Sequence, residues 1–186
     1  DGGMAALCDA LAADLGDVVR LGSVVTKVTH DETAVVTLAS GETIEARTVV
    51  STLPPRLAVA LEYDPPLPQW RRDVAEKVAP GNVIKAYLVY ETPFWRERGL
   101  SGQSSSDEGA VRVTFDTTLA DSTRGLLMGF FEGNEADSLA RRPLEVRRRA
   151  FVESAVRAFG VEAAEPVEYL ERDWSAEQYT RGCHGA

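Results

Sequence analysis

The sequence predicts an α+β fold, in which a β-meander precedes a mixed or antiparallel sheet with flanking helices. Three observations support this class. Apolar and polar residues alternate with a period of two between residues 18 and 51. Polar turns at 30–32 and 40–42 separate those runs, as antiparallel hairpins require. Further along, strand-like runs and helical stretches are mixed without the regular alternation of a parallel α/β sheet.

The first part of the chain favours one helix followed by the meander. Apolar residues recur at near-helical spacing, and Gly16 follows as a stop signal: Leu7, Cys8, Leu11 and Leu15. We therefore expect an amphipathic helix over residues 4–15, with Cys8 packed in its apolar face. Strands are expected at 18–21, 24–28, 34–38 and 43–51, before Pro54 and Pro55 end the ladder.

The remainder begins with a proline-rich connector at 63–68. Pro68 suits the first turn of a helix at 69–77. The strand expected at 82–90 contains Lys85 among apolar residues. Further strands are expected at 111–115, 125–131 and 166–172, helices at 135–140 and 144–159, and a polar loop at 101–109.

Composition limits the function classes. The chain has 186 residues, 44% hydrophobic and 26% charged, which is typical of a globular protein with a sizeable core. A net charge of -9 opposes binding to a phosphate backbone, so we expect no nucleic-acid partner. The basic run at 141–149 has acidic neighbours Glu145 and Glu153, which predicts a solvent-exposed helix face.

No run approaches the roughly 18 apolar residues of a membrane helix, and the chain starts without a signal-peptide pattern. We therefore expect a cytoplasmic protein with no membrane partner. Its two cysteines lack the spacing of a zinc site, so no metal is expected. Near the end, Cys183 stands beside Arg181 and His184, an arrangement that suits a reactive thiol, although a lone cysteine is more often a packed residue.

Six segments occur in an order and spacing that resemble the flavin-dependent monoamine oxidases. They are 49–55, 64–68, 81–85, 92–96, 129–130 and 174–183. The resemblance covers essentially the whole chain, which is similar to the central portion of such an enzyme. It implies that residues 1–74 belong to an FAD-binding domain, 75–176 form the substrate-binding domain, and 177–186 begin the return to the FAD-binding domain.

The resemblance assigns a catalytic role to Lys85, where the family has a lysine that reaches through a water toward N5 of the flavin. A lysine in an otherwise apolar strand is costly to bury unless it is solvated or paired, which independently suits a functional position. The alternative is that Lys85 points into solvent from the polar side of its strand.

The same resemblance implies cofactor-binding roles for Val25, Trp174, Tyr179 and Cys183. Val25 matches a backbone position that hydrogen-bonds the adenine of FAD, and the two aromatic residues match positions beside the flavin and on the pocket wall. Cys183 matches the thioether position of mammalian-type members, although many bacterial relatives bind FAD without a bond. Ordinary packing is the alternative for the aromatic residues.

Two residues are implied to bind substrate, Phe130 and His184. Phe130 matches a pocket-lining position, but its apolar setting also suits the core. At His184 the sequence departs from the family, since mammalian-type members have a tyrosine there as one wall of an aromatic cage. The preferred amine is therefore left open.

The implied function is oxidative deamination of a small amine by an FAD-dependent parent enzyme, which uses O2 and yields an aldehyde, ammonia or an amine, and H2O2. The glycine fingerprint of a dinucleotide-binding unit is absent from the chain, so we expect it to be inactive alone and not to retain FAD. A polyamine or L-amino acid oxidase is a second possibility, and a non-catalytic binding or assembly module a third. Open sheet edges lead us to expect a homo-oligomer.

Overall fold

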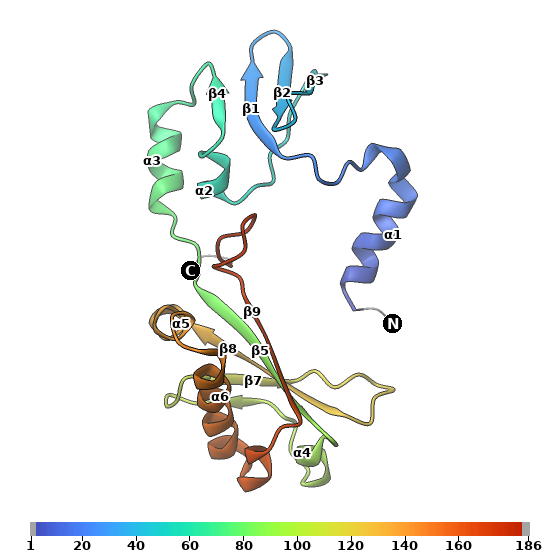
Figure 1. Ribbon diagram of the computed structural model, residues 1–186, viewed down its shortest axis with the longest axis vertical. Helices are drawn as coiled ribbons and strands as arrows, with labels where there is room; N and C mark the ends of the chain where they lie inside the picture. The colour runs from blue at the N-terminus through green and yellow to red at the C-terminus, as the bar shows by residue number, and fades with distance from the viewer. Residues whose placement is uncertain (1–2, 184–186) are drawn as a thin grey trace. The chain divides into compact units, whose positions relative to one another are not determined.

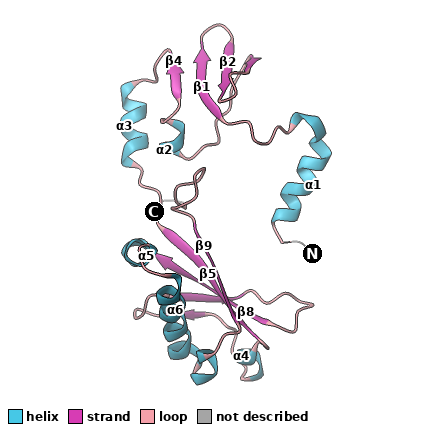
Figure 2. Ribbon diagram, in the orientation of Figure 1, coloured by secondary structure: helices cyan, strands magenta, loops and turns pink. Residues whose placement is uncertain are grey.

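The computed structural model describes residues 3–183. The chain divides into two compact units, Asp1–Lys77 and Val78–Ala186, which are described separately (Figure 1). The first contains a four-stranded sheet and the second a five-stranded sheet, each accompanied by helices (Figure 2). The predicted α+β class with mixed and antiparallel sheets is confirmed.

The first unit is built around the expected meander. Its strands β1, β2 and β3 pair antiparallel, while β4 runs parallel to β1 at the other side, giving the order β3-β2-β1-β4. In chain order the elements are α1 (Ala5–Leu15), the 3-10 turn η1 (Gly16–Val18), β1 (Val25–His30), β2 (Ala34–Leu38), β3 (Thr43–Ala46), α2 (Pro55–Ala58), β4 (Glu62–Asp64) and α3 (Gln69–Lys77).

Three expectations for this unit are wrong. The strand expected at 18–21 does not form, because the 3-10 turn occupies its start and Leu21 is 90% exposed, with no partner strand. The last strand of the meander ends at Ala46, well before residue 51. Cys8 is exposed and not packed, because α1 buries none of its residues against the described chain.

The second unit carries the five-stranded sheet in the order β6-β7-β8-β5-β9, with every neighbouring pair antiparallel. Figure 1 shows β9 beside β5 although they lie far apart in the sequence. The elements are β5 (Val83–Tyr90), α4 (Phe94–Glu97), β6 (Ser104–Ser105), β7 (Val113–Asp116), β8 (Gly125–Glu132), α5 (Gly133–Ala140), α6 (Leu144–Phe159), the 3-10 turn η2 (Val161–Ala164) and β9 (Glu168–Asp173).

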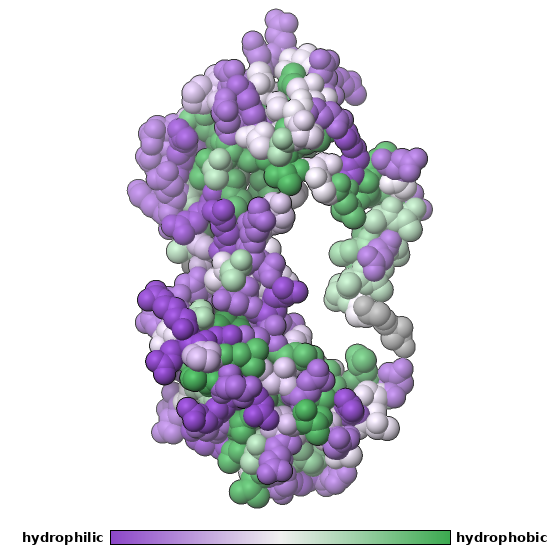
Figure 3. Space-filling model, viewed as in Figure 1, coloured by the Kyte–Doolittle hydropathy of each residue, from purple (hydrophilic) through white to green (hydrophobic). Residues whose placement is uncertain are grey.

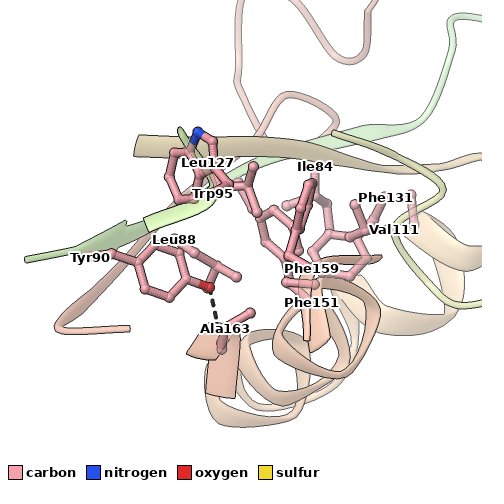
Figure 4. Packing of buried hydrophobic residues seen from close by; sticks show 13 residues of the cluster. Ile84, Leu88, Tyr90, Trp95, Val111, Leu127, Phe131, Phe151, Phe159 and Ala163 are labelled. Carbon is pink, nitrogen blue, oxygen red and sulfur yellow. Dashed lines mark hydrogen bonds between the residues drawn. The ribbon is translucent and has the colours of Figure 1, made fainter. Parts of the chain in front are cut away.

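The core of the second unit lies between one face of this sheet and α6 (Figure 4). Alternate residues of β5 and β8 point toward the helix and meet Phe151 and Phe159. Gly129 permits the close approach: a Cβ there would lie 2.5 Å from Val111 Cγ1 and 2.7 Å from Phe151 Cζ. Because α6 occupies this face, the side chains at the intervening strand positions are left on the opposite face.

Arg147 is not part of a solvent-exposed helix face, contrary to the prediction for the basic run. Its guanidinium forms a paired, two-nitrogen contact with the Glu171 carboxylate on β9, and only 13% and 12% of the two side chains are exposed. Arg147 also donates to the carbonyls of Leu139 and Arg142, and Tyr169 donates to Glu171. The pair therefore joins α6, the end of α5 and β9.

Asp116 anchors α4 to β7. Its carboxylate accepts hydrogen bonds from Trp95 Nε1 at 2.8 Å, Arg96 Nε at 2.6 Å and the Thr118 amide at 2.9 Å. Burial opposes ionisation of this carboxyl, but hydrogen bonds from Arg96, Thr118 and Trp95 outweigh it and lower its pKa from 3.8 to about 2. The ionised form of Asp116 thus stabilises the fold.

This shift predicts a specific loss of stability in acid. Because the folded pKa lies below the unfolded one, the contribution of Asp116 is complete above the unfolded value of 3.8 and disappears as the pH falls through about 2. A shift of this size corresponds to about 2 kcal/mol. Urea denaturation between pH 5 and pH 2 should show the loss in the wild type, and Asp116→Asn should flatten it by that amount. Equal slopes for the two proteins would contradict the assignment.

The outer strands of the second sheet discourage edge pairing, since β6 has two residues and β9 carries charges at Glu168, Glu171, Arg172 and Asp173. The oligomer expected through open edges stays a prediction. Across residues 3–183, no helix combines the length and apolar character needed to span a bilayer. In the same range, no group of three His, Cys, Asp or Glu residues is arranged to hold a metal ion.

Candidate functional site

The candidate site begins with the face of the five-stranded sheet that points away from α6, here called the open face. Successive side chains of a strand point to opposite faces, so the residues between the core-facing ones lie on this face. Their side chains are partly or fully exposed. They come from four strands: Lys85, Tyr87, Phe115, Met128, Phe130, Leu170 and Arg172. Figure 3 shows apolar residues reaching the surface of each unit.

Lys85 lies in the middle of this face and is partly exposed. Across the sheet its backbone pairs with Phe130 on one side and Arg172 on the other. The ammonium lies 5.4 Å from the centroid of the Tyr87 ring, within reach of a cation–π contact. Within residues 3–183, no carboxylate lies within salt-bridge distance of Lys85 Nζ.

The neighbouring cation on the open face, Arg172, has a carboxylate partner. Arg172 Nη1 donates to Glu177 Oε1 at 2.7 Å, so this guanidinium is paired. Lys85 is thus an ammonium on an aromatic surface, without a carboxylate from the described residues and open to hydrogen bonding. Lys85 is therefore neither deeply buried nor simply exposed to solvent, the two possibilities considered from the sequence.

Phe130 belongs to the open face and not to the core. Its ring meets that of Phe115 edge to face, with centroids 6.4 Å apart, and it is partly buried. The residue beside it, Phe131, is fully buried against α6. Of the two roles considered for Phe130, core packing is therefore excluded by the strand register.

The segment Trp174–Cys183, here called the terminal loop, returns to the start of β5. The Trp174 amide donates to the Val83 carbonyl at 3.2 Å. Cys183 and Gly81 exchange two backbone hydrogen bonds, at 2.8 and 3.2 Å, as an isolated antiparallel bridge. Gly182 is required there, since a Cβ would lie 2.5 Å from Pro80 Cβ. The bridge sets Cys183 roughly 13 Å along the strand direction from Lys85, at about 3.3 Å per residue.

The two aromatic residues of the terminal loop are not packed in a core. Trp174 is 37% exposed and Tyr179 is 58% exposed, so neither belongs to the buried core of the second unit. An exposed indole, an exposed phenol and an ammonium without a carboxylate partner among the described residues are side-chain types that suit a planar, polar-edged ring such as a flavin. The residues present therefore fit the cofactor that the resemblance implies.

The remaining predicted residues stand apart from this arrangement. Val25 opens β1 in the first unit and pairs with Leu38, and the register with β2 shifts between Val25 and Lys27, so that Thr26 is the residue without a partner in the ladder. His184 lies outside the described residues. The second unit thus carries Lys85 and Phe130 on the open face and attaches the terminal loop, with Trp174, Tyr179 and Cys183, at the beginning of β5.

Comparison with known proteins gives the decisive observation. The family model described as "Flavin containing amine oxidoreductase" matches residues 1–186. The chain belongs to this flavin-containing amine oxidoreductase family. The resemblance stated from sequence is confirmed, and with it the description of the chain's relatives as flavoproteins and amine oxidases.

Among family members, the chain is 38% identical over 181 residues to the putative flavin-containing monoamine oxidase AofH of Mycobacterium tuberculosis. That match covers 97% of this chain and 39% of AofH. It is 37% identical to the putrescine oxidase of Kocuria rosea, covering 100% of the chain and 41% of that relative. The chain therefore spans about two-fifths of the length of these relatives.

Solved structures of the family agree. A redesigned putrescine oxidase matches with a TM-score of 0.94 and 38% identity over 99% of this chain and 41% of its own. Cyclohexylamine oxidase from Brevibacterium oxydans matches with a TM-score of 0.91 and 30% identity, covering 97% of this chain and 40% of its own. The amine oxidoreductase fold is thus shared by this chain.

Five open-face residues were not foreseen as part of the site: Tyr87, Phe115, Met128, Leu170 and Arg172. The period-two alternation of β5 relates Tyr87 to Lys85, so that residue was within reach of the sequence. The other four depend on the register of β5 with β8 and β9 and of β8 with β7, which joins residues far apart in the chain.

Proposed function

We propose that this chain forms one wall of the active site of an FAD-dependent amine oxidase, which converts an amine, O2 and water into an aldehyde, ammonia or an amine, and H2O2. The observation that carries the proposal is Lys85, an ammonium on an aromatic face that has no carboxylate of the described chain within salt-bridge distance and lies on the strand to which the terminal loop is attached. When bound, FAD supplies the oxidant that removes hydride from the carbon next to the amine nitrogen.

The catalytic role falls to Lys85. An ammonium has three donors and no acceptor, and Tyr87 covers one side of it. Its remaining donors are therefore available to hold a water molecule or a cofactor edge over the open face. The cost of leaving a partly buried ammonium without a carboxylate supports a functional reason for the lysine.

The other proposed residues bind the cofactor or enclose the substrate. Trp174, Tyr179 and Cys183 border the flavin from the terminal loop, and Val25 offers backbone groups to the adenine. Phe130 forms the apolar wall against which the carbon chain of the amine packs, and His184 contributes to the same pocket. We assign the domains accordingly: residues 75–176 form the substrate-binding domain, and the flanking segments belong to the FAD-binding domain.

We further propose that residues 1–186 alone retain no FAD and are inactive. A dinucleotide needs a glycine-rich turn at a helix N-terminus to hold its pyrophosphate, and this sequence contains no such fingerprint. The rest of the catalytic unit then comes from sequence equivalent to the part of the relatives that the chain does not span.

The proposed substrate is a small monoamine or diamine. The similarity to a putrescine oxidase, in sequence and in solved structure, supports a diamine in particular. An L-amino acid substrate would add a carboxylate. Lys85, the one open-face cation of the described chain without an acidic partner, is assigned above to a water or the cofactor edge, so that carboxylate would have no counter-charge.

The test is a peroxide assay on the longest natural polypeptide that contains these residues. Putrescine, an aryl-alkyl amine and L-amino acids are compared at equal concentration. We expect kcat/KM for putrescine or the aryl-alkyl amine to exceed that for any L-amino acid at least about tenfold, the discrimination that one unpaired charge provides. Preference for an L-amino acid would overturn the substrate class, and the absence of both flavin and peroxide would support a non-catalytic module.

A further inference from the structure

The terminal loop is closed at a single carbonyl. The Trp174 oxygen accepts a hydrogen bond from the Gly182 amide at 2.8 Å and from the Thr180 hydroxyl at 3.0 Å. A carbonyl oxygen has two lone pairs, so this acceptor is fully used. Gly182 is buried, which places the closure against the body of the second unit. The ends of the loop are thereby held together.

This closure determines where Cys183 lies. Gly182 donates to Trp174, and the next residue, Cys183, forms the two-bond bridge to Gly81. Trp174 itself donates to Val83. The two ends of the loop are therefore attached to Val83, the first residue of the strand carrying Lys85, and to Gly81, two residues before it. A change in loop conformation would move Trp174 and Cys183 relative to that lysine.

Among the described residues, Thr180 supplies the side-chain contribution to this closure. Its own amide and that of Arg181 donate to the Glu177 carbonyl, at 3.3 and 2.9 Å, so the hydroxyl sits on a defined turn. The backbone at Arg181 has a φ of 49°, a left-handed conformation that costs a non-glycine residue free energy. Contacts that hold this turn must offset that cost, and the Thr180 hydroxyl is one of them.

A second contact reaches the same turn from the sheet, through the Arg172–Glu177 ion pair. Its side chains are 63% and 38% exposed, and ion pairs this open contribute little. The Thr180 hydroxyl bond is also exposed, but it joins two uncharged groups, so added salt does not screen it as it screens the ion pair. The two contacts can therefore be separated by experiment.

We infer that Thr180 is a positioning residue: its hydroxyl locks the terminal loop and so fixes Trp174 and Cys183 relative to Lys85. The significance for catalysis rests on the proposed function, whereas the locking itself does not. Thr180 has no role of its own in the proposed reaction and acts through the backbone carbonyl of Trp174, a residue proposed above to border the flavin.

The experiment compares Thr180→Val, which keeps the shape and removes the hydroxyl, with Thr180→Ser, which keeps the hydroxyl. Amide hydrogen exchange in the 186-residue chain is measured at Gly182 and Cys183, with Leu127 and Phe131 as core references. Loss of one hydrogen bond should speed exchange of both loop amides about fivefold in Thr180→Val and leave the core amides unchanged. Thr180→Ser should restore wild-type rates, and the matched variant Glu177→Gln should change them less than about twofold.

Equal exchange in Thr180→Val and the wild type, or a failure of Thr180→Ser to restore the rates, would overturn the inference. A uniform change that includes the core amides would also overturn it, since it would indicate general destabilisation. In the longest natural polypeptide, Thr180→Val should lower kcat/KM for an amine about fivefold and Thr180→Ser should not. If the exchange result holds while no amine is oxidised, the locking role stands and the proposed function fails.

Discussion

Replacing Lys85 with methionine in the longest natural polypeptide should lower kcat for amine oxidation by about 100-fold, the lower end of what a positioned proton donor contributes. Methionine keeps the length and apolar stem of lysine but has no N–H donors. The side chain at position 85 would therefore keep its contact with Tyr87 while losing its ammonium. The measurement is steady-state peroxide release at saturating amine.

The control is Lys77→Met, at the exposed end of α3, which should leave kcat unchanged. Bound FAD, measured from its visible absorbance, should be equal in wild type and Lys85→Met, so that a fall in kcat cannot be attributed to cofactor loss. If Lys85→Met turns over at the wild-type rate with full FAD, the catalytic role assigned to Lys85 is wrong.

The second large effect concerns stability. Glu171→Gln should lower the free energy of unfolding of the second unit by about 3 kcal/mol, because it leaves the nearly buried guanidinium of Arg147 without its counter-charge. In the folded chain burial raises the pKa of Glu171, but the hydrogen bonds from Arg147 and Tyr169 outweigh this and lower it overall. The loss is measured by urea denaturation.

Trp95 is fully buried in the second unit and can report on this transition. In a background of Trp70→Phe and Trp174→Phe, both at more exposed sites, its fluorescence follows the core alone. The matched control is Glu153→Gln, which breaks the Arg149–Glu153 pair on the same helix, where the side chains are 73% and 62% exposed. That variant should cost less than about 0.5 kcal/mol. Equal losses for the two variants would contradict the buried ion pair.

Elements with strong local signals were predictable from the sequence. Helices at 69–77 and 144–159 match α3 and α6 in full, because Pro68 and Gly160 mark their ends and their apolar residues recur with helical spacing. Strand β2 also matches at both ends, between two polar turns. Lys85 and Cys183 could be singled out because a lysine in an apolar strand and a cysteine between a cation and a histidine are locally unusual.

Features that depend on distant partners could not be predicted. In the sequence, Arg147 cannot be distinguished from the two arginines that follow it in an apparently exposed run. It is largely buried because Glu171, on the distant strand β9, pairs with it. Strand β4 has three residues and pairs parallel to β1 across more than thirty positions. The apolar run at 18–21 resembles a strand locally but has no neighbour in the described chain to pair with. The open face emerges only from the register of four strands.

The anaerobic absorbance spectrum of the longest natural polypeptide, before and after putrescine, tests the central claim most directly. If Lys85 and the terminal loop border a flavin that oxidises amines, the protein should carry a flavin band that bleaches when the amine is added without oxygen. The band should remain in the presence of an amine-free buffer. A protein without a flavin band, or one whose band no amine bleaches, would contradict the proposed site.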